Sequence, residues 1–212
     1  MPTDILRDDI EYIIHAEPDG TIIGPISKTH AHMDGARSVL THHSTWSMVY
    51  HRASGRYGLQ LKNPAKHDKH GAGKWDMGVA GHNCYVKENG MYRPLGFDET
   101  LVKEAGEEIG IRIAMSHTLE DFMRHIRNAP DNARGFIFER FHYRTETDNE
   151  WVGLGFIVVP DTDVRFRDQE VLEFRWLSPD ELKTYLKTHD DYCAPLPLVF
   201  EKAEAFRKEH GL

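Results

Sequence analysis

Apolar residues recur along the chain with two different periods, and each period predicts a different kind of element. Alternating or continuous apolar runs predict β-strands at 10–15, 21–25, 45–51, 57–61, 77–82, 135–143, 151–159 and 171–177. Helical periodicity predicts α-helices at 98–109, 118–127, 179–187 and 197–209. Strands that recur around one strong central helix predict an α/β fold with a mixed sheet between helices. The 212 residues fit one domain with additions better than they fit two domains.

Residues at the ends of these segments indicate where the helices begin and end. Asp98 is a good N-cap candidate for the first helix, and Gly110 suits the left-handed position after its last turn. Thr118 is the corresponding cap of the second helix, and Ser178 followed by Pro179 opens the third. The central helix is therefore bounded at both ends by residues typical of helix termini.

Composition narrows the class of protein. The net charge of -8 argues against a general nucleic-acid-binding surface, which needs a basic face. No window approaches 18 consecutive apolar residues, so we expect no membrane-spanning helix. The opening residues 1–4 lack the basic and apolar regions of a signal peptide. Because Cys84 and Cys193 follow no metal or redox spacing, a reduced cytoplasmic setting is the simplest expectation.

The most concentrated chemistry lies in the first predicted helix. Glu104, Glu107 and Glu108 are spaced three and four apart, so their side chains share one side of the helix. Three carboxylates on one side of a helix repel one another and raise one another's pKa, unless a cation lies among them. Mg²⁺ binds a few carboxylate oxygens and bridges to substrate phosphates, and Mn²⁺ accepts the same oxygen ligands. The alternative is a solvated acidic helix face.

Histidines are the second candidate group of metal ligands. The chain has 14 of them, including the pairs His30/His32, His42/His43 and His67/His70. These spacings match no zinc signature, so ordinary surface histidines are the simpler interpretation.

The segment 103–111 resembles the second half of the Nudix box, G-x5-E-x7-R-E-U-x-E-E-x-G-U, where U is a bulky aliphatic residue. The three glutamates match, as do Gly110 and Ile111. Lys103 stands where the family has arginine, and Ala105 is a small form of U. Leu95 stands where the first glutamate is expected. The helical half of the box is therefore retained and the first half is altered.

A second motif lies upstream. Trp75-Asp76-Met77-Gly78-Val79-Ala80-Gly81-His82 resembles the W-D-x-S-x-A-G-H stretch of the Nudix subgroup related to isopentenyl-diphosphate isomerase. Residues 83–94 are interpreted as an inserted loop, because Gly90 and Pro94 are typical of turns. Further likenesses to this subgroup are found at 11–14 with 21–24, at Ala31-His32, at His42-His43, at 169–171 and at 175–178. The resemblance covers roughly residues 9–187.

The resemblance implies the Nudix fold, an α/β/α sandwich with a mixed sheet. It places an N-terminal β-hairpin extension at 1–40, the Nudix domain at 41–188 and a C-terminal helical extension at 189–212. The turn signal Pro18-Asp19-Gly20 supports the hairpin.

The resemblance also implies a site. Glu104, Glu107 and Glu108 would hold the metal, with Glu108 or Glu104 as general base, and Lys103 would orient a glutamate. His82 and Glu150 match metal ligands of the isomerase, although a core histidine and a solvated strand end are the alternatives.

Three further residues belong to the isomerase comparison. Asp148 lies two residues before Glu150, and on an extended strand that spacing puts both side chains on one face. His32 and His42 would complete the isomerase metal site.

Other residues are candidates for substrate contact. Lys62 and Lys66 could contact phosphate or belong to a solubilising loop. The aromatic rings of Trp46, Tyr57 and Trp151 could stack on a base, but such residues in strands are more often part of the core.

Three functions remain open at this stage. The leading hypothesis is a Mg²⁺-dependent Nudix hydrolase that cleaves a diphosphate linkage in a nucleoside diphosphate derivative or a similar small metabolite. An isomerase would need a catalytic cysteine at position 80, where this chain has alanine, and Cys84 does not occupy the matching place. A non-catalytic ligand sensor is the third hypothesis, favoured by Leu95 and Lys103.

The expected partner is a small-molecule diphosphate, and an exposed sheet edge or the C-terminal helix could pair two copies into a homodimer.

Overall fold

A mixed sheet is the centre of the fold. The computed structural model describes residues 6–66, 70–129, 131–166 and 169–212. The main path of the sheet runs in the order β12-β4-β3-β11-β10-β9. Its strands are β3 (His42–His51), β4 (Arg56–Lys62), β9 (Ala114–Ser116), β10 (Arg134–Arg144), β11 (Asn149–Val159) and β12 (Val171–Leu177). The long β3 and β11 strands pair in parallel at the middle of the sheet, and β9 and β10 also pair in parallel.

Shorter strands join this sheet at one end. They are β1 (Tyr12–Ala16), β2 (Ile22–Ser27), β5 (Trp75–Met77) and β6 (Val79–His82). The segment 77–82, predicted as one strand, is two, because the chain changes partner at Gly78. There β5 pairs with β4 and β6 pairs with β3. A Cβ atom on Gly78 would lie 2.5 Å from Val49 Cγ2, so the crossing requires glycine.

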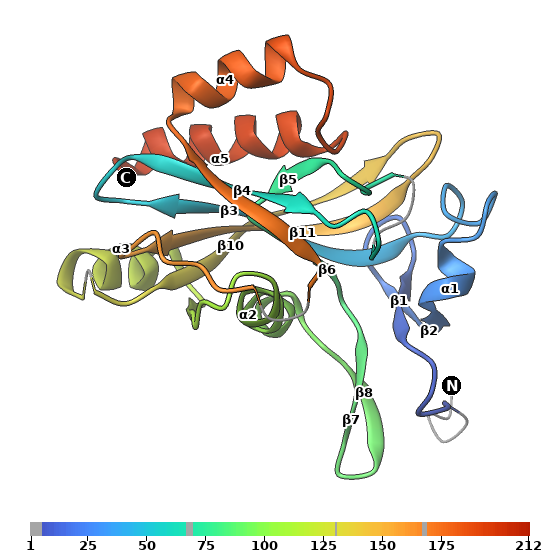
Figure 1. Ribbon diagram of the computed structural model, residues 1–212. Helices are drawn as coiled ribbons and strands as arrows, with labels where there is room; N and C mark the ends of the chain where they lie inside the picture. Colours follow the sequence, from blue (N-terminus) through green and yellow to red (C-terminus); the bar gives the residue numbers. More distant parts are fainter. Residues whose placement is uncertain (1–5, 67–69, 130, 167–168) are drawn as a thin grey trace.

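Helices cover both faces of the sheet, so the Nudix sandwich implied by the sequence is confirmed (Figure 1). On one face lies α2 (Phe97–Glu108), with Leu101 and its C-cap residue Ile109 fully buried. On the other lie α4 (Pro179–Thr188) and α5 (Leu196–His210). The short α1 (Lys28–Ala31) follows β2, and α3 (Leu119–Asn128) packs near the β9–β10 edge. None of the helices described combines the length and apolar character that a membrane span requires.

The predicted helix ends are confirmed with one exception. Thr118 and Ser178 cap α3 and α4, and Gly110 has a φ of 69° after α2. The prediction of Asp98 as N-cap of α2 is wrong, because the helix begins two residues earlier with Gly96 as its cap. The Glu99 carboxylate accepts a hydrogen bond from the Gly96 N–H at 3.0 Å, which stabilises the earlier start.

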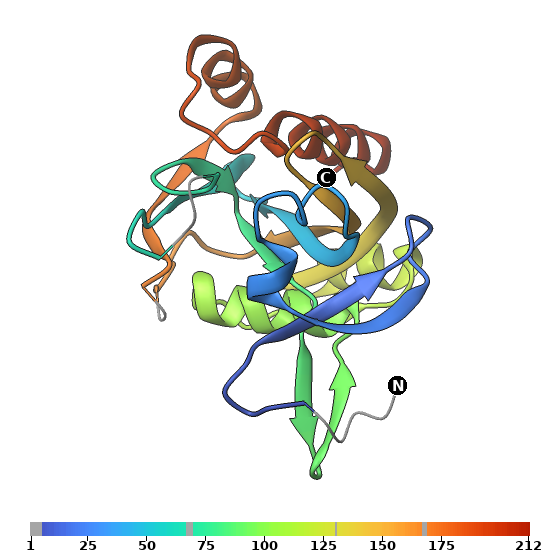
Figure 2. The ribbon, with the colours of Figure 1, turned by 90° about the vertical axis from the view of Figure 1, so that its right-hand side faces the viewer.

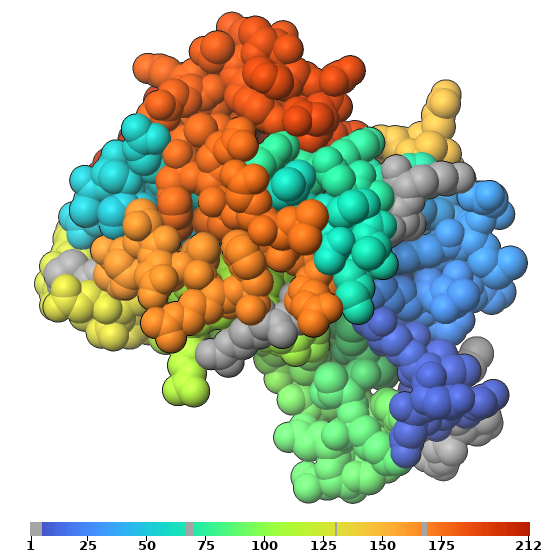
Figure 3. All heavy atoms as spheres, viewed as in Figure 1, coloured from blue at the N-terminus to red at the C-terminus, as the bar shows by residue number. Residues whose placement is uncertain are grey.

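The insertion at 83–94 is a β-hairpin rather than a loop. It consists of β7 (Tyr85–Glu88) and β8 (Met91–Pro94), joined by a tight turn in which Asn89 and Gly90 both have positive φ. The hairpin projects from the body of the protein (Figure 2). The chain just before β1 lies beside it (Figure 3), where Lys87 and Asp8 form an ion pair at 2.8 Å.

Candidate active site

One large cavity collects most of the residues that carry chemistry. It has a volume of about 480 Å³ and lies at the end of the sheet where β3, β6 and β11 meet α2 and the N-terminal segment. Its walls include Glu104 and Glu107 from α2, His82 from β6, and Glu150 from β11. The N-terminal extension supplies a further wall with His32. Residues far apart in the sequence therefore share one site.

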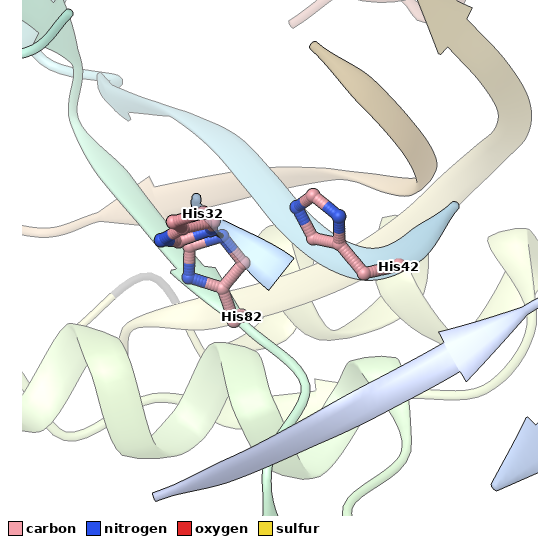
Figure 4. Close-up of side chains that lie close together, drawn as sticks. All are labelled: His32, His42 and His82. Atoms are coloured by element: carbon pink, nitrogen blue, oxygen red, sulfur yellow. Dashed lines mark hydrogen bonds between the residues drawn. The ribbon is translucent and has the colours of Figure 1, made fainter. Parts of the chain in front are cut away.

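Three histidines lie close together (Figure 4), of which His32 and His82 line this cavity and His42 is fully buried. His82 ends β6, His42 begins β3, and His32 follows α1. The Nε2 atoms of His32 and His82 lie 3.2 Å apart, and one nitrogen of each of the three rings lies within 4.8 Å of the others. The β3–β6 pairing brings His82 opposite Ser44, two residues along the strand from His42. The fold therefore assembles a histidine cluster that no local spacing in the sequence indicates.

Two carboxylates join the cluster through His42. In the parallel β3–β11 pair, Glu150 stands directly opposite His42. Potential ligand atoms of His42, Asp148 and Glu150 lie within 4.8 Å of one another, so the predicted common face of the two carboxylates is observed. Among the residues described, no hydrogen-bond partner is found for the buried His42 Nε2 or Glu150 Oε2.

These atoms fit a divalent cation. A buried nitrogen and a buried carboxylate oxygen that lack partners cost free energy unless something binds them. The two groups share His42, and each offers nitrogen or mixed nitrogen and oxygen ligands of the kind that suit zinc, manganese or iron. The histidines, Asp148 and Glu150 are thus the strongest candidate metal centre in the described part of the chain.

Burial and neighbouring charges shift the pKa values of the residues at the centre in different directions. Burial and the two neighbouring histidines hold the pKa of His82 well below its usual value, which keeps the ring neutral and able to bind a metal. Burial opposes protonation of His42, but Glu150 outweighs it and raises the pKa of His42. Burial and the Glu150 charge raise the pKa of Asp148 to about 7, against the opposing effect of Arg37. The pKa of Glu150 is lowered despite burial, because His42 lies beside it.

The helix glutamates form a second, separate group. Lys103 Nζ lies 2.9 Å from Glu104 and 2.7 Å from Glu107, so the lysine holds both carboxylates in the way predicted for it. Glu104 packs against Gly81, where a Cβ atom would lie 2.4 Å from its carboxyl carbon. Glycine at 81 therefore lets this carboxylate lie directly beside the β6 backbone, one residue before His82.

Glu108 differs from the other two glutamates. It is 1% exposed, and its oxygens accept hydrogen bonds from the Ala80 N–H at 3.0 Å and Gln60 Nε2 at 3.2 Å. Burial raises its pKa to about 8, although Lys62 opposes the shift. Among the described residues, two groups of three side chains have potential ligand atoms within 4.8 Å of one another. Both groups contain histidine, and neither contains Glu104, Glu107 or Glu108.

The two predicted phosphate-binding lysines both line the cavity. Lys62 is largely buried, and its Nζ forms an ion pair with Asp76 at 3.3 Å. Lys66 follows on the adjoining loop.

The aromatic candidates divide between core and cavity. Tyr57 is a fully buried core residue, and the Trp151 indole packs under Gly20 in the N-terminal turn. Trp46 lines the cavity together with Tyr143, with ring centroids 5.1 Å apart.

Cys84 lies near the site without taking the place of the isomerase cysteine. Its thiol donates a hydrogen bond to Glu11 at 3.3 Å, and burial raises its pKa to about 12. Ala80, at the position where the resemblance to the isomerase would require a cysteine, lines the cavity.

Sequence analysis did not single out several polar residues at the site. The Arg37 guanidinium donates one hydrogen bond to each carboxylate oxygen of Asp148, at 3.3 and 3.4 Å. Asn149 lies between Asp148 and Glu150 in the sequence. The Glu11–Lys28 ion pair, at 3.0 Å, forms part of the wall. No spacing rule could have found these residues, because their partners come from distant segments.

Comparison with known proteins bears on the fold. No protein-family model matches the sequence, and no curated protein does either. The structure is similar to that of DR0079 from Deinococcus radiodurans, with a TM-score of 0.62 and 13% identity over 91% of this chain and 99% of that one. It is also similar to the MutT protein from Methanosarcina mazei Go1, with a TM-score of 0.52 and 16% identity over 78% of this chain and 94% of that one. The chain has the Nudix fold. A hydrolase of the Nudix family from Clostridium perfringens matches with a TM-score of 0.48 and 14% identity over 78% of this chain and 97% of that one.

Proposed function

We propose that the chain is a divalent-metal-dependent hydrolase that cleaves a diphosphate linkage in a nucleoside diphosphate derivative or a similar small metabolite. One observation carries the proposal: two lysines, the Glu104 and Glu107 carboxylates of α2 and Glu150 of the His42–Glu150 pair all line a single cavity. A volume of about 480 Å³ suits a small-molecule ligand. The Nudix fold of the MutT protein from Methanosarcina mazei supports the same class of reaction by analogy.

Two groups of residues would hold cations. His32, His42, His82, Asp148 and Glu150 would hold one, and their nitrogen-rich set favours manganese, zinc or iron. Glu104 and Glu107 offer only oxygen and would hold Mg²⁺, for which Mn²⁺ can substitute. Glu108, the third ligand predicted from the sequence, is buried and bonded to the Ala80 N–H, so we assign it no metal. When bound, such cations neutralise the diphosphate and lower the pKa of a water molecule.

The protein residues have distinct roles in this proposal. Glu104 is the better placed general base, because it lines the cavity and burial raises its pKa. Lys103 holds that carboxylate in position. Lys62 and Lys66 contact the phosphate oxygens as point charges. Glu108 supports the backbone at Ala80 on the cavity floor.

A panel of diphosphate compounds tests the proposal. The wild type, Glu104→Gln and the matched control Glu201→Gln, an exposed glutamate on α5, are compared for phosphate release with Mg²⁺, with Mn²⁺ and with chelator. The panel contains nucleotide sugars, dinucleoside polyphosphates, nucleoside triphosphates and isopentenyl diphosphate, and added phosphatase exposes monophosphate products. We expect metal-dependent release that Glu104→Gln reduces by at least about 100-fold and the control leaves unchanged. Folded wild type that releases nothing from any compound contradicts a hydrolase.

The isomerase alternative keeps one observation in its favour. The four residues that the isomerase resemblance implies as ligands, His32, His42, His82 and Glu150, fall in the two groups that share His42. The cysteine it needs is missing, because position 80 is alanine. Conversion of isopentenyl diphosphate to its allylic isomer without phosphate release would favour this function. Tight binding of a panel compound with neither reaction would favour the sensor.

A further inference from the structure

The segment that carries His32 lies on the surface and has little hydrophobic anchorage. None of the residues 32–40 is buried, and Met33 and Val39 are among the most exposed apolar residues, at 57% and 66%. Its backbone hydrogen bonds are local, for example from the Arg37 N–H to Met33 O and from the Leu40 N–H to Ala36 O. Because apolar burial is the usual source of a fixed position, polar contacts must determine where this segment lies.

Asn149 supplies several of those contacts, beside the ion pair of Arg37 with Asp148. It is 3% exposed, and its side-chain NH₂ donates to Ser38 O at 3.4 Å and to Val39 O at 3.0 Å. Its side-chain oxygen accepts from Thr41 Oγ1 at 3.1 Å and from His142 Nε2 at 2.6 Å. Two donors and two acceptor sites are all that an asparagine side chain offers, and all four are used. Two backbone carbonyls fix the orientation of the amide, since only its nitrogen can donate to them.

The position of Asn149 in the sequence links its hydrogen bonds with Ser38, Val39 and Thr41, here called the clamp, to the metal centre. Asn149 is the first residue of β11 and lies between two candidate ligands, Asp148 just before the strand and Glu150 on it. The short stretch 148–150 therefore presents two candidate ligands and also contacts the segment that carries a third, His32. The residues that Asn149 contacts, 38–41, run directly into His42, which begins β3 opposite Glu150. At the other end of the segment, His32 follows Ala31, which is fully buried.

We infer that Asn149 is a positioning residue of the metal centre, which clamps residues 32–41 onto β11 and thereby delivers His32 to His42 and His82. The inference rests on the metal centre of the proposed function. It assigns Asn149 no contact with substrate or metal. Its effect on metal binding passes through His32 and through no other ligand.

A double-mutant cycle with metal affinity as readout tests this directly. Co²⁺ alone is titrated into the chelator-treated full chain, and visible absorbance reports affinity and ligand set. The four proteins are wild type, Asn149→Ala, His32→Ala and the double variant. Supporting contacts of this kind contribute about 10- to 100-fold to metal affinity, so we expect Asn149→Ala to weaken Co²⁺ binding by that factor and to give the absorption spectrum of His32→Ala. In the His32→Ala background, Asn149→Ala should change the affinity by less than about 2-fold.

The other outcomes are distinguishable. Equal weakening in both backgrounds would mean that Asn149 acts through Asp148, Glu150 or the fold in general, and the inference would be wrong. Unchanged affinity in Asn149→Ala would also overturn it, while leaving the metal centre intact. Wild type that binds no Co²⁺ would overturn the histidine-containing centre itself, independently of the phosphate-release assay. If Asn149→Ala does not fold, Thr41→Val removes one of the four hydrogen bonds, and a smaller loss with the same dependence on His32 is expected.

Discussion

His42 Nε2 lies 3.7 Å from Glu150 Oε1, across the parallel pair formed by β3 and β11. This distance is too long for a hydrogen bond, although both side chains are almost completely buried. A buried imidazole and a buried carboxylate that approach without bonding leave polar atoms that a shared cation would satisfy. The relationship makes a thermodynamic prediction, because an ion that binds only the folded state stabilises it.

Divalent transition metal should raise the melting temperature of the chelator-treated protein. At a free concentration of about 100 times Kd, the stabilisation is about 2.7 kcal/mol. That corresponds to roughly 5–10 °C for a chain of this size. His42→Ala should abolish the increase, and His117→Ala, a histidine with an 80% exposed side chain, should retain it. Scanning calorimetry with and without Mn²⁺ measures both, and a wild-type melting temperature unchanged by metal would contradict the histidine-containing centre.

Glu108 should make the metal-free protein less stable as the pH rises. Burial raises the pKa of Glu108 to about 8 from its ordinary 4.5, so the fold favours the protonated form. The stability contributed by this group is fully present below about pH 4.5 and is lost as the pH rises towards 8. Glu108→Gln cannot ionise and should not lose this stability. The melting temperature of the variant minus that of the wild type should therefore increase from pH 5 to pH 8.

Thermal melts in chelator at several pH values measure this difference. Glu107→Gln, which changes a half-exposed carboxylate on the same helix, is the matched control. The prediction is wrong if the melting temperatures of Glu108→Gln and the wild type change in parallel with pH over this range. That result would mean that Glu108 ionises in the folded protein without a loss of stability.

The sequence pattern predicted local features of this protein and left out the distant pairings. The strand and helix positions follow from hydrophobic periodicity, and the common face of Asp148 and Glu150 follows from strand geometry. That His42 lies opposite Glu150 depends on a parallel pairing between segments about a hundred residues apart, which no local period encodes. The same limit explains why the histidine spacings matched no zinc signature, and why the clamp made by Asn149 was missed. The hairpin at 85–94 was interpreted as a loop because its strands have only four residues each.

The buried contact between Glu204 and Tyr57 should stabilise the docking of α5. Glu204 accepts hydrogen bonds from Tyr57 Oη at 2.9 Å and from Arg207 Nε at 2.8 Å. Burial opposes its ionisation, but Arg207 and Tyr57 lower its pKa to about 2. This stability is present above about pH 4.5 and is lost as the pH falls towards 2.

Glu204→Gln should therefore reduce the free energy of unfolding at pH 7 by about 1.5–3 kcal/mol, the value of hydrogen bonds to a charged group. The deficit should shrink at pH 3. Urea unfolding at both pH values measures it, with Glu201→Gln on the exposed side of α5 as control. A deficit equal at the two pH values would mean that the charge of Glu204 is not what stabilises the contact.

Gly20 should tolerate no side chain, because the Trp151 indole occupies the space. A Cβ atom at position 20 would lie 2.2 Å from Trp151 Nε1, and Gly20 has a φ of 87°, which favours glycine. Gly20→Ala should destabilise the protein by about 1–3 kcal/mol, since the residue combines overpacking with an unfavourable backbone conformation. Gly106→Ala is the matched control, because a Cβ atom on that helical glycine meets nothing within 4 Å. It should stabilise the protein by about 0.5–1 kcal/mol. Urea unfolding of the two variants should therefore give changes of opposite sign, and a neutral Gly20→Ala would show that the N-terminal turn moves freely away from Trp151.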